Sequence, residues 1–193
     1  MGVREEFERR AMRCLMNAPP HVWDRGSLPV PVELVASDVY GLRVCLKSPA
    51  EMRTAPGLPE LATDEQLSGL LLPDRRQIWV NAEEANQSRG RRRFTICHEL
   101  GHWVMHRVAR RRPLYCRSRS MKHGEEESPA GPIPDDPDIE EEAHLFAAAM
   151  LMPMPLVRRE YERYRDAGEE FFTLCDRFGA SGAAMGRRLH QVI

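Results

Sequence analysis

The chain has 193 residues, 42% of them hydrophobic and 30% charged, which is the composition of an ordinary folded protein with one main domain. The formal net charge of −1 provides no overall attraction to nucleic acid or to a membrane surface. The five cysteines are an odd number and form no CxxC pair. This argues against a disulfide framework and against a cysteine-based zinc site.

The cellular compartment is expected to be the cytoplasm. The first residues carry charges throughout and lack the apolar stretch of a signal peptide. No apolar run is long enough to span a bilayer. The cysteine usage fits the same reducing compartment, so no membrane partner is expected.

The first half of the chain is predicted to combine one helix with a small sheet and a second, longer helix. Prolines and glycines mark the breaks between these elements. The expected elements are, in chain order, a helix over 4–17, a short helix, a turn at Gly41 and a strand over 29–47, a loop over 48–64, two short strands over 68–82 and an amphipathic helix over about 91–108.

The second half is predicted to be helical after one long loop. Residues 113–137 contain five prolines and two glycines, and their charge switches from basic to acidic near Gly124, which indicates a flexible surface loop. Helices are then expected over 138–152, 155–166, 168–178 and 181–191. The predicted fold class is therefore α+β, with a small mixed or antiparallel sheet packed on a helical core and a helical C-terminal region.

The clearest motif is His98-Glu99-Leu100-Gly101-His102, within an apolar-periodic segment. On a helix, residues four apart share a face, so both imidazoles can reach one metal ion. A glutamate beside the first histidine can take a proton from a water at the same ion. We therefore predict that His98 and His102 bind Zn²⁺, with Mn²⁺ also compatible, and that Glu99 is the general base. The alternative is a pair of hydrogen-bonded histidines in the core.

A third ligand is predicted on the acidic start of the helix near residue 140. Glu140 shares a helical face with Ala143, His144 and Ala147, and the small residues of this face would allow a close approach to the HExxH helix. Glu140 is the favoured ligand and Glu142 is a rival, whereas Glu141 should point away. His144 could orient a ligand from one turn further on.

Other polar residues have more open roles. His106 continues the four-residue spacing, but it is about 12 Å from His98 along a straight helix, so we expect it to cap the helix or lie on the surface. The metzincin pattern is excluded, because Met105 and Val108 replace its Gly and His. Candidates for stabilising a transition-state oxyanion are Tyr115, His123 and His144, among which the sequence does not choose.

The two central segments resemble a known family. The sequence IWVNAEEANQSRGRRRFTICHELGHWVMH, followed after a variable loop by EEEAHLFAAAMLMP, is similar to the ImmA/IrrE family of zinc metallopeptidases. That family shows a strand ending in Asn, then F-T-x-x-H-E-x-G-H, then E-x-x-A-N-x-F-A-x-x-L-L-M-P. The close similarity covers about residues 75–156, and weaker similarity extends over most of the chain.

The resemblance implies both site and function. It assigns His98, His102 and Glu140 as zinc ligands and Glu99 as base, and it places His144 where the family usually has Asn. It implies a metallopeptidase domain over 1–152, including the 113–137 loop, with a helical extension over 153–193. It also implies a regulatory endopeptidase that cleaves helix-turn-helix repressors and so derepresses stress-response or mobile-element genes.

A different class of function is also open. The C-terminal segment DRFGASGAAMGRRLHQVI resembles a short helix-turn-helix with the basic residues Arg187 and Arg188, so the chain could be a DNA-binding or protein-binding regulator with a non-catalytic metal site. The arginines of 89–93 could attract an acidic partner, although a solvated approach to the helix is favoured. The basic residues of 107–122 could contact nucleic acid, which is not favoured because aromatic side chains are scarce there.

Overall fold

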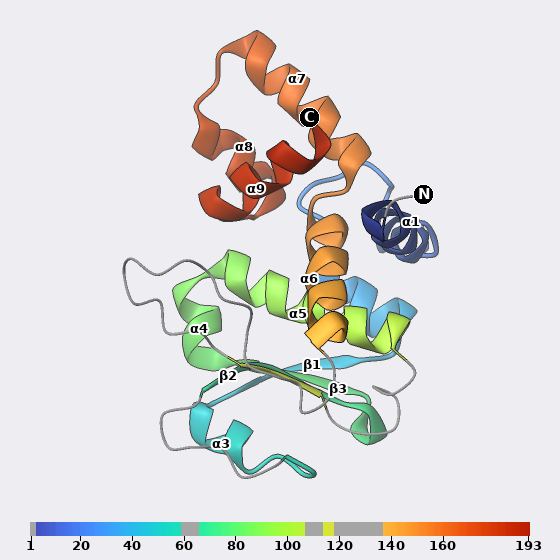
Figure 1. Cartoon of the computed structure of the whole chain (residues 1–193), viewed down its shortest axis with the longest axis vertical. Coiled ribbons are helices and arrows are strands. Elements are labelled where there is room, and N and C mark those ends of the chain that lie inside the picture. The colour runs from blue at the N-terminus through green and yellow to red at the C-terminus, as the bar shows by residue number, and fades with distance from the viewer. Residues whose placement is uncertain (1–2, 59–65, 107–113, 118–136) are drawn as a thin grey trace.

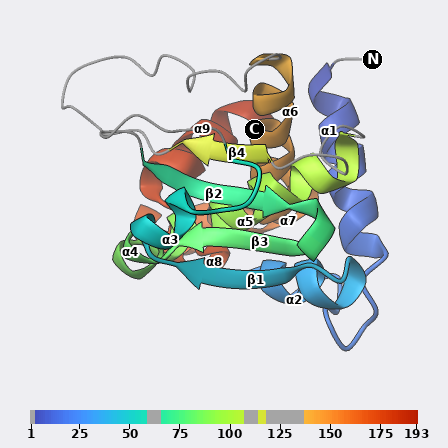
Figure 2. The same cartoon turned by 90° about the horizontal axis from the view of Figure 1, so that it is seen from below.

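The computed structural model describes residues 3–58, 66–106, 114–117 and 137–193. Its sheet has four strands in the order β1-β3-β2-β4, seen face-on in Figure 2. The strands are β1 (Arg43–Lys47), β2 (Leu67–Leu72), β3 (Gln77–Asn81) and β4 (Leu114–Arg117). β1 is parallel to β3, whereas β2 is antiparallel to both β3 and β4. The predicted α+β class with a small mixed sheet is confirmed.

Helices cover both faces of the sheet and extend the molecule away from it (Figure 1). The α-helices are α1 (Val3–Met16), α2 (Val32–Leu34), α3 (Pro49–Arg53), α4 (Ala82–Gln87), α5 (Arg89–Met105), α6 (Pro137–Leu151), α7 (Met154–Ala167), α8 (Phe171–Phe178) and α9 (Gly182–Val192). A π-helix η1 (Val35–Val39) follows α2, and a 3-10 turn η2 (Pro73–Arg75) lies between β2 and β3. α5 lies along one face of the sheet, α3 lies on the other, and α6 crosses α5 (Figure 1).

Strand β2 is buried along its whole length because it has helices on both sides. Leu70 and Leu72 belong to a small apolar cluster with Met52 of α3, whereas Leu71 belongs to the main core beneath α5. The register of β2 shifts between Leu67 and Gly69. Because of this shift, Leu67 shares a face with Leu70, although strict alternation would place them on opposite faces.

The main core continues from the sheet through α5 and α6 into the C-terminal helices. Phe146 and Met150 of α6 and Phe178 of α8 are fully buried members of one cluster. Arg188 of α9 is also buried, and its Nε donates a hydrogen bond of 2.8 Å to the carbonyl of Met152. The core therefore crosses residue 152, and the domain boundary expected there stays a prediction.

Most of the predicted elements are confirmed, with three corrections. The first helix, the turn at Gly41, the strands around Pro73 and the four C-terminal helices lie within a few residues of their predicted bounds. The loop predicted over 48–64 in fact begins with α3, which starts with a capping box between Ser48 and Glu51. The helix α4 was not predicted, and the loop predicted over 113–137 contains β4; the rest of that loop lies outside the described residues.

The arginine run is solvated only in part, because Arg89 and Arg91 are exposed whereas Arg92 and Arg93 are not. Arg93 is buried and donates a hydrogen bond of 2.7 Å to the carbonyl of Val30. Arg92 forms an ion pair of 2.8 Å with Glu33. These arginines therefore join α5 to the segment before β1, rather than forming one open basic surface.

No helix in the described parts of the chain combines the length and the apolar character needed to cross a membrane.

Candidate metal centre

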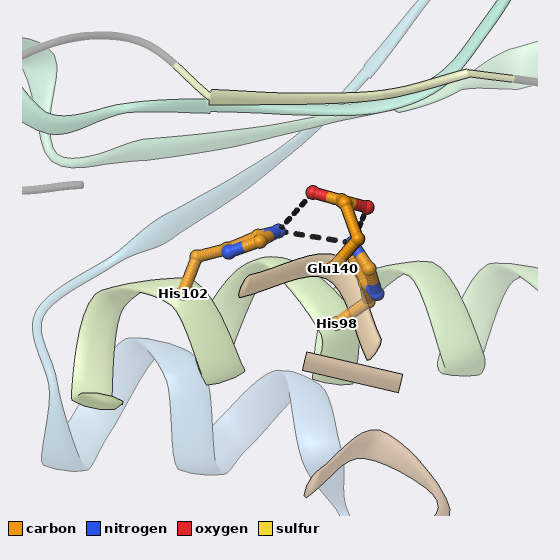
Figure 3. A group of neighbouring side chains, drawn as sticks. All are labelled: His98, His102 and Glu140. Carbon is orange, nitrogen blue, oxygen red and sulfur yellow. Dashed lines mark hydrogen bonds and ion pairs between the residues drawn. The ribbon is translucent and has the colours of Figure 1, made fainter. Parts of the chain in front are cut away.

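Helix α5 places the two histidines of the HExxH motif on one buried face. It begins after Ser88, whose side chain accepts a hydrogen bond from the backbone N–H of Arg91. One turn separates His98 from His102, and both side chains are completely buried. The face that carries them is turned toward α6 and the sheet (Figures 1 and 3). The predicted helical setting of the motif is confirmed.

Helix α6 brings Glu140 to this face because the two helices approach closely. A Cβ atom at Gly101 of α5 would lie 3.0 Å from Phe146 Cδ1 and 3.5 Å from the Cα of Ala143. A larger residue would therefore force the Phe146 ring to move by a few tenths of an ångström, whereas glycine allows the contact as it stands. Ala143 is fully buried against it, as expected from the small face predicted for α6.

Three potential ligand atoms converge between the helices (Figure 3). His98 Nε2 lies 3.1 Å from one carboxylate oxygen of Glu140, His102 Nε2 lies 3.0 Å from the other, and the two Nε2 atoms are 3.0 Å apart. Ligand atoms about 2.05 Å from a tetrahedral zinc ion lie about 3.3 Å from one another. The group can therefore hold one ion after movements of a few tenths of an ångström, and among the described residues it is the group with metal-binding geometry.

The protonation states of the three residues suit a cation. Burial lowers the pKa of both His98 and His102, although the contacts with Glu140 partly offset this effect. Burial alone would raise the pKa of Glu140, but the close contacts of its carboxylate with His102 and His98 outweigh it and hold that pKa well below its usual range. Two neutral imidazoles and one carboxylate are the forms that bind zinc.

Unpaired oxygens supply a further test of the fit. Glu140 Oε1 has no hydrogen-bond partner among the described residues, although it lies close to His102 Nε2, and the same is true of both carboxylate oxygens of Glu99. Buried polar atoms without partners are rare in folded proteins. A metal ion with a water beside Glu99 would satisfy these atoms, so the residues present fit such an ion.

Glu99 is held on the sheet side of α5. Burial, and secondly the charge of Glu140, raise the pKa of Glu99 well above its ordinary value. Its side chain lies against Gly69 of β2, where a Cβ atom would be only 2.5 Å from Glu99 Oε1. A carboxyl group with a raised pKa near a metal-binding group is suited to accept and return a proton.

The remaining predicted site residues lie around this group or outside the described part. His144 packs edge-on against His98, with ring centroids 4.6 Å apart, and its Nδ1 donates a hydrogen bond of 2.8 Å to the carbonyl of Glu140. Its role in orienting a ligand or stabilising an oxyanion stays a prediction. Tyr115 belongs to β4, but its side chain is outside the described structure, as is the whole of His123.

The rival ligand Glu142 lies on another side of the cluster. Its carboxylate contacts His106 at 3.0 Å and does not belong to the group formed with His98 and His102. Glu141 is exposed, in agreement with the expectation that it points away. His106 ends α5, as expected of a cap, but its side chain is buried, so the surface position that we also allowed is wrong.

Sequence reasoning missed Gly69 and the contact between His106 and Glu142. A glycine in an otherwise apolar strand is a known sign of close approach, so Gly69 had a detectable signal. The contact between His106 and Glu142 depends on how α6 is rotated against α5, for which the sequence contains no comparable local sign.

The comparison with known families agrees with this geometry. The family model described as the IrrE N-terminal-like domain (Peptidase_M78) matches residues 40–190. The chain belongs to this family. The IrrE N-terminal-like match starts just before β1 and ends within α9, so it includes the sheet, both metal-site helices and the C-terminal helices. A comparison with curated proteins finds no match.

Membership in a peptidase family and the buried His-His-Glu group support the same conclusion. The chain is of the metallopeptidase type, its substrate is a protein or peptide, and His98, His102 and Glu140 could hold a metal ion.

Proposed function

We propose that this chain is a zinc-dependent endopeptidase in which His98, His102 and Glu140 bind the metal and Glu99 is the general base. The observation that carries the proposal is the convergence of three buried ligand atoms, each 3.0–3.1 Å from the next, beside a buried carboxyl group with no partner among the described residues. Mn²⁺ is the alternative ion, because imidazole and carboxylate ligands accept both metals.

The chemistry follows from what each residue can do. A bound zinc ion supplies Lewis acidity and lowers the pKa of a water molecule to about 7. Glu99 takes a proton from the attacking water and returns it to the leaving amine. His98, His102 and Glu140 would hold the metal beside α5. Because all these groups are buried, their electrostatic interactions are stronger than they would be in water.

We further propose that the substrate is a helix-turn-helix transcriptional repressor, so that cleavage derepresses stress-response or mobile-element genes. The support for this substrate is the resemblance of the two central segments to the ImmA/IrrE peptidases. The alternative of a DNA-binding regulator has less support, because Arg188 is buried against the carbonyl of Met152.

The test is cleavage of a purified repressor encoded beside this chain, with zinc supplied and with zinc removed by a chelator. The wild-type chain should contain about one zinc ion and cut the repressor. Glu99→Gln should keep the zinc and lose cleavage by at least about 100-fold, as expected for a general base. Glu140→Gln should lose both.

The exposed neighbour Glu141→Gln is the matched control and should retain zinc and activity. Cleavage by Glu99→Gln at the wild-type rate would remove Glu99 from the role of base. A wild-type chain that binds no zinc would overturn the metal centre itself. Zinc binding without cleavage of the repressor, but with cleavage of unfolded protein, would exclude only the substrate class.

A further inference from the structure

His106 connects the metal-binding group to a second carboxylate. It is the C-cap residue that directly follows α5, and its backbone N–H donates a hydrogen bond of 3.0 Å to the carbonyl of His102. Its ring Nδ1 lies 3.1 Å from His102 Nδ1, and its Nε2 lies 3.0 Å from Glu142 Oε2. A series of contacts therefore links Glu142 of α6, through His106, to the edge of the His102 ring that faces away from Glu140.

The contacts with His106 and Glu142 favour one direction for the hydrogen bonds in this series. An ionised carboxylate only accepts, so the Nε2–H of His106 donates to Glu142. A neutral imidazole has one N–H, which leaves a lone pair on His106 Nδ1. The Nδ1–H of His102 can then donate to this lone pair. In the metal-free site Glu140 Oε1, 3.0 Å from His102 Nε2, competes for the same proton, so it is the contact with His106 that favours the tautomer with a lone pair on Nε2, which a metal ligand requires.

The other histidine of the motif lacks such support. Within the described structure, His98 Nδ1 is buried and has no hydrogen-bond partner. The ring of His98 is positioned by packing, with the rings of His102 and His144 each 4.6 Å away between centroids. The hydrogen-bonded support is therefore concentrated on His102, so the loss of His106 should affect the metal group directly.

We propose that His106 and Glu142 are positioning residues that hold His102 in the orientation and tautomer needed for metal binding. The proposal rests on the metal centre proposed above and deepens it. A purely structural link between the ends of α5 and α6 is the alternative. Glu142 is 41% exposed, and an ion pair of that exposure contributes little to stability. The two interpretations therefore differ in whether metal affinity or only stability depends on the pair.

The experiment measures zinc affinity of the full chain by competition with a chromophoric chelator. His106→Leu removes the acceptor for His102 and should weaken zinc binding about 10- to 100-fold, the usual effect of losing an outer partner of a ligand. His106→Asn places an oxygen near the position of Nδ1 and should recover part of that loss. Glu142→Gln should weaken binding less than His106→Leu does.

The matched controls are His190→Leu and Glu141→Gln, because both residues are exposed and neither should change zinc affinity. Urea unfolding of the metal-free variants separates stability from affinity. If His106→Leu binds zinc as tightly as the wild type, the positioning role is wrong, while the metal centre and the peptidase function stand. If the wild type binds no zinc, both proposals fail.

A measurement without metal keeps the proposal testable if His106→Leu does not fold. Nitrogen NMR of metal-free Glu140→Ala, which removes the carboxylate that competes for the His102 proton, should show the proton of His102 on Nδ1 and that of His106 on Nε2. The opposite tautomer of His102, with its proton on Nε2, would overturn the proposal. Cobalt substitution gives an independent signal, because a changed visible spectrum in His106→Asn would report an altered orientation of His102.

Discussion

The absence of a side chain at Gly69 determines where Glu99 can lie. A Cβ atom at Gly69 would be 2.5 Å from Glu99 Oε1 and also 2.5 Å from Thr95 Cγ2. Glu99 could swing away from such an atom, but Thr95 is β-branched and has little freedom on a helix. The strand and α5 would therefore have to separate, or Glu99 would have to leave its position.

We expect Gly69→Ala to impair catalysis more than stability. Unfolding in urea should show a loss of about 1–3 kcal/mol, as for overpacking in a core. Cleavage should fall about 100-fold, because a catalytic group displaced by about 1 Å loses this much. Adding Thr95→Ser removes one of the two clashes, so it should recover stability without recovering cleavage.

Gly186→Ala is the control for this substitution. No atom lies within 4 Å of the position that its Cβ would take, and alanine is favoured over glycine within a helix by about 1 kcal/mol. Cleavage by Gly186→Ala should be unchanged. Wild-type cleavage by Gly69→Ala would show that Glu99 does not depend on this glycine.

The site residues differed in how far the sequence could predict them. The placement of His98 and His102 on one face of a helix depends only on local spacing. The choice between Glu140 and Glu142 needed the rotation of α6 relative to α5, which arises from packing of Gly101 against Ala143. Sequence spacing favoured Glu140, which the structure places beside the two histidines, but it could not show what Glu142 contacts instead.

At the scale of elements, α3 shows how a short helix can be stabilised by its first turn. Ser48 accepts a hydrogen bond from the backbone N–H of Glu51, and the Glu51 carboxylate accepts hydrogen bonds from the backbone and hydroxyl of Ser48. Lys47 Nζ also lies 2.8 Å from Glu51 Oε1. These contacts, that of Lys47 first, lower the pKa of Glu51 from 4.5 to about 2.

The lowered pKa of Glu51 predicts how the stability of the protein depends on pH, including its sign. The pKa of Glu51 is lower in the folded state than in the unfolded state, so its contribution to stability is complete above pH 4.5 and is lost as the pH falls toward 2. Lys47→Gln should raise the midpoint of Glu51 in a carbon NMR titration of its side-chain carboxyl group. Arg43→Gln, which removes a charge from the same strand, should leave the midpoint in place. Equal midpoints in all three proteins would contradict the assigned contact.

The elements that the sequence missed are short. α4 is capped by Asn81, which accepts hydrogen bonds from the N–H groups of Glu83 and Glu84 and donates one to the carbonyl of Leu67. Six residues are too few for a helix to be stable alone, so apolar periodicity gives little sign of it. β4 likewise exists only through pairing with β2, a long-range contact within a segment whose prolines favoured a loop.

At the scale of the whole molecule, Arg188 joins the C-terminal helices to the rest of the core. Its Nε donates to the carbonyl of Met152, and its Nη1 forms an ion pair with Glu8 of α1. We expect Arg188→Met to lower the free energy of unfolding by about 1–3 kcal/mol, because the buried carbonyl loses its partner. The exposed neighbour Arg187→Met should change it by no more than about 0.5 kcal/mol. Urea unfolding that shows equal effects for both would contradict this assignment.

The close crossing of α5 and α6 has a consequence for chain topology. A metal held by His102 and Glu140 would act as a removable cross-link that closes a loop of chain between two distant positions. Loop-closure entropy grows only with the logarithm of loop length, about 0.6 kcal/mol for each doubling. The length of the connection between the helices is therefore weakly constrained, whereas the residues at its two ends are fixed to within ångströms. Evolution can lengthen or shorten that connection while the centre that it closes is preserved.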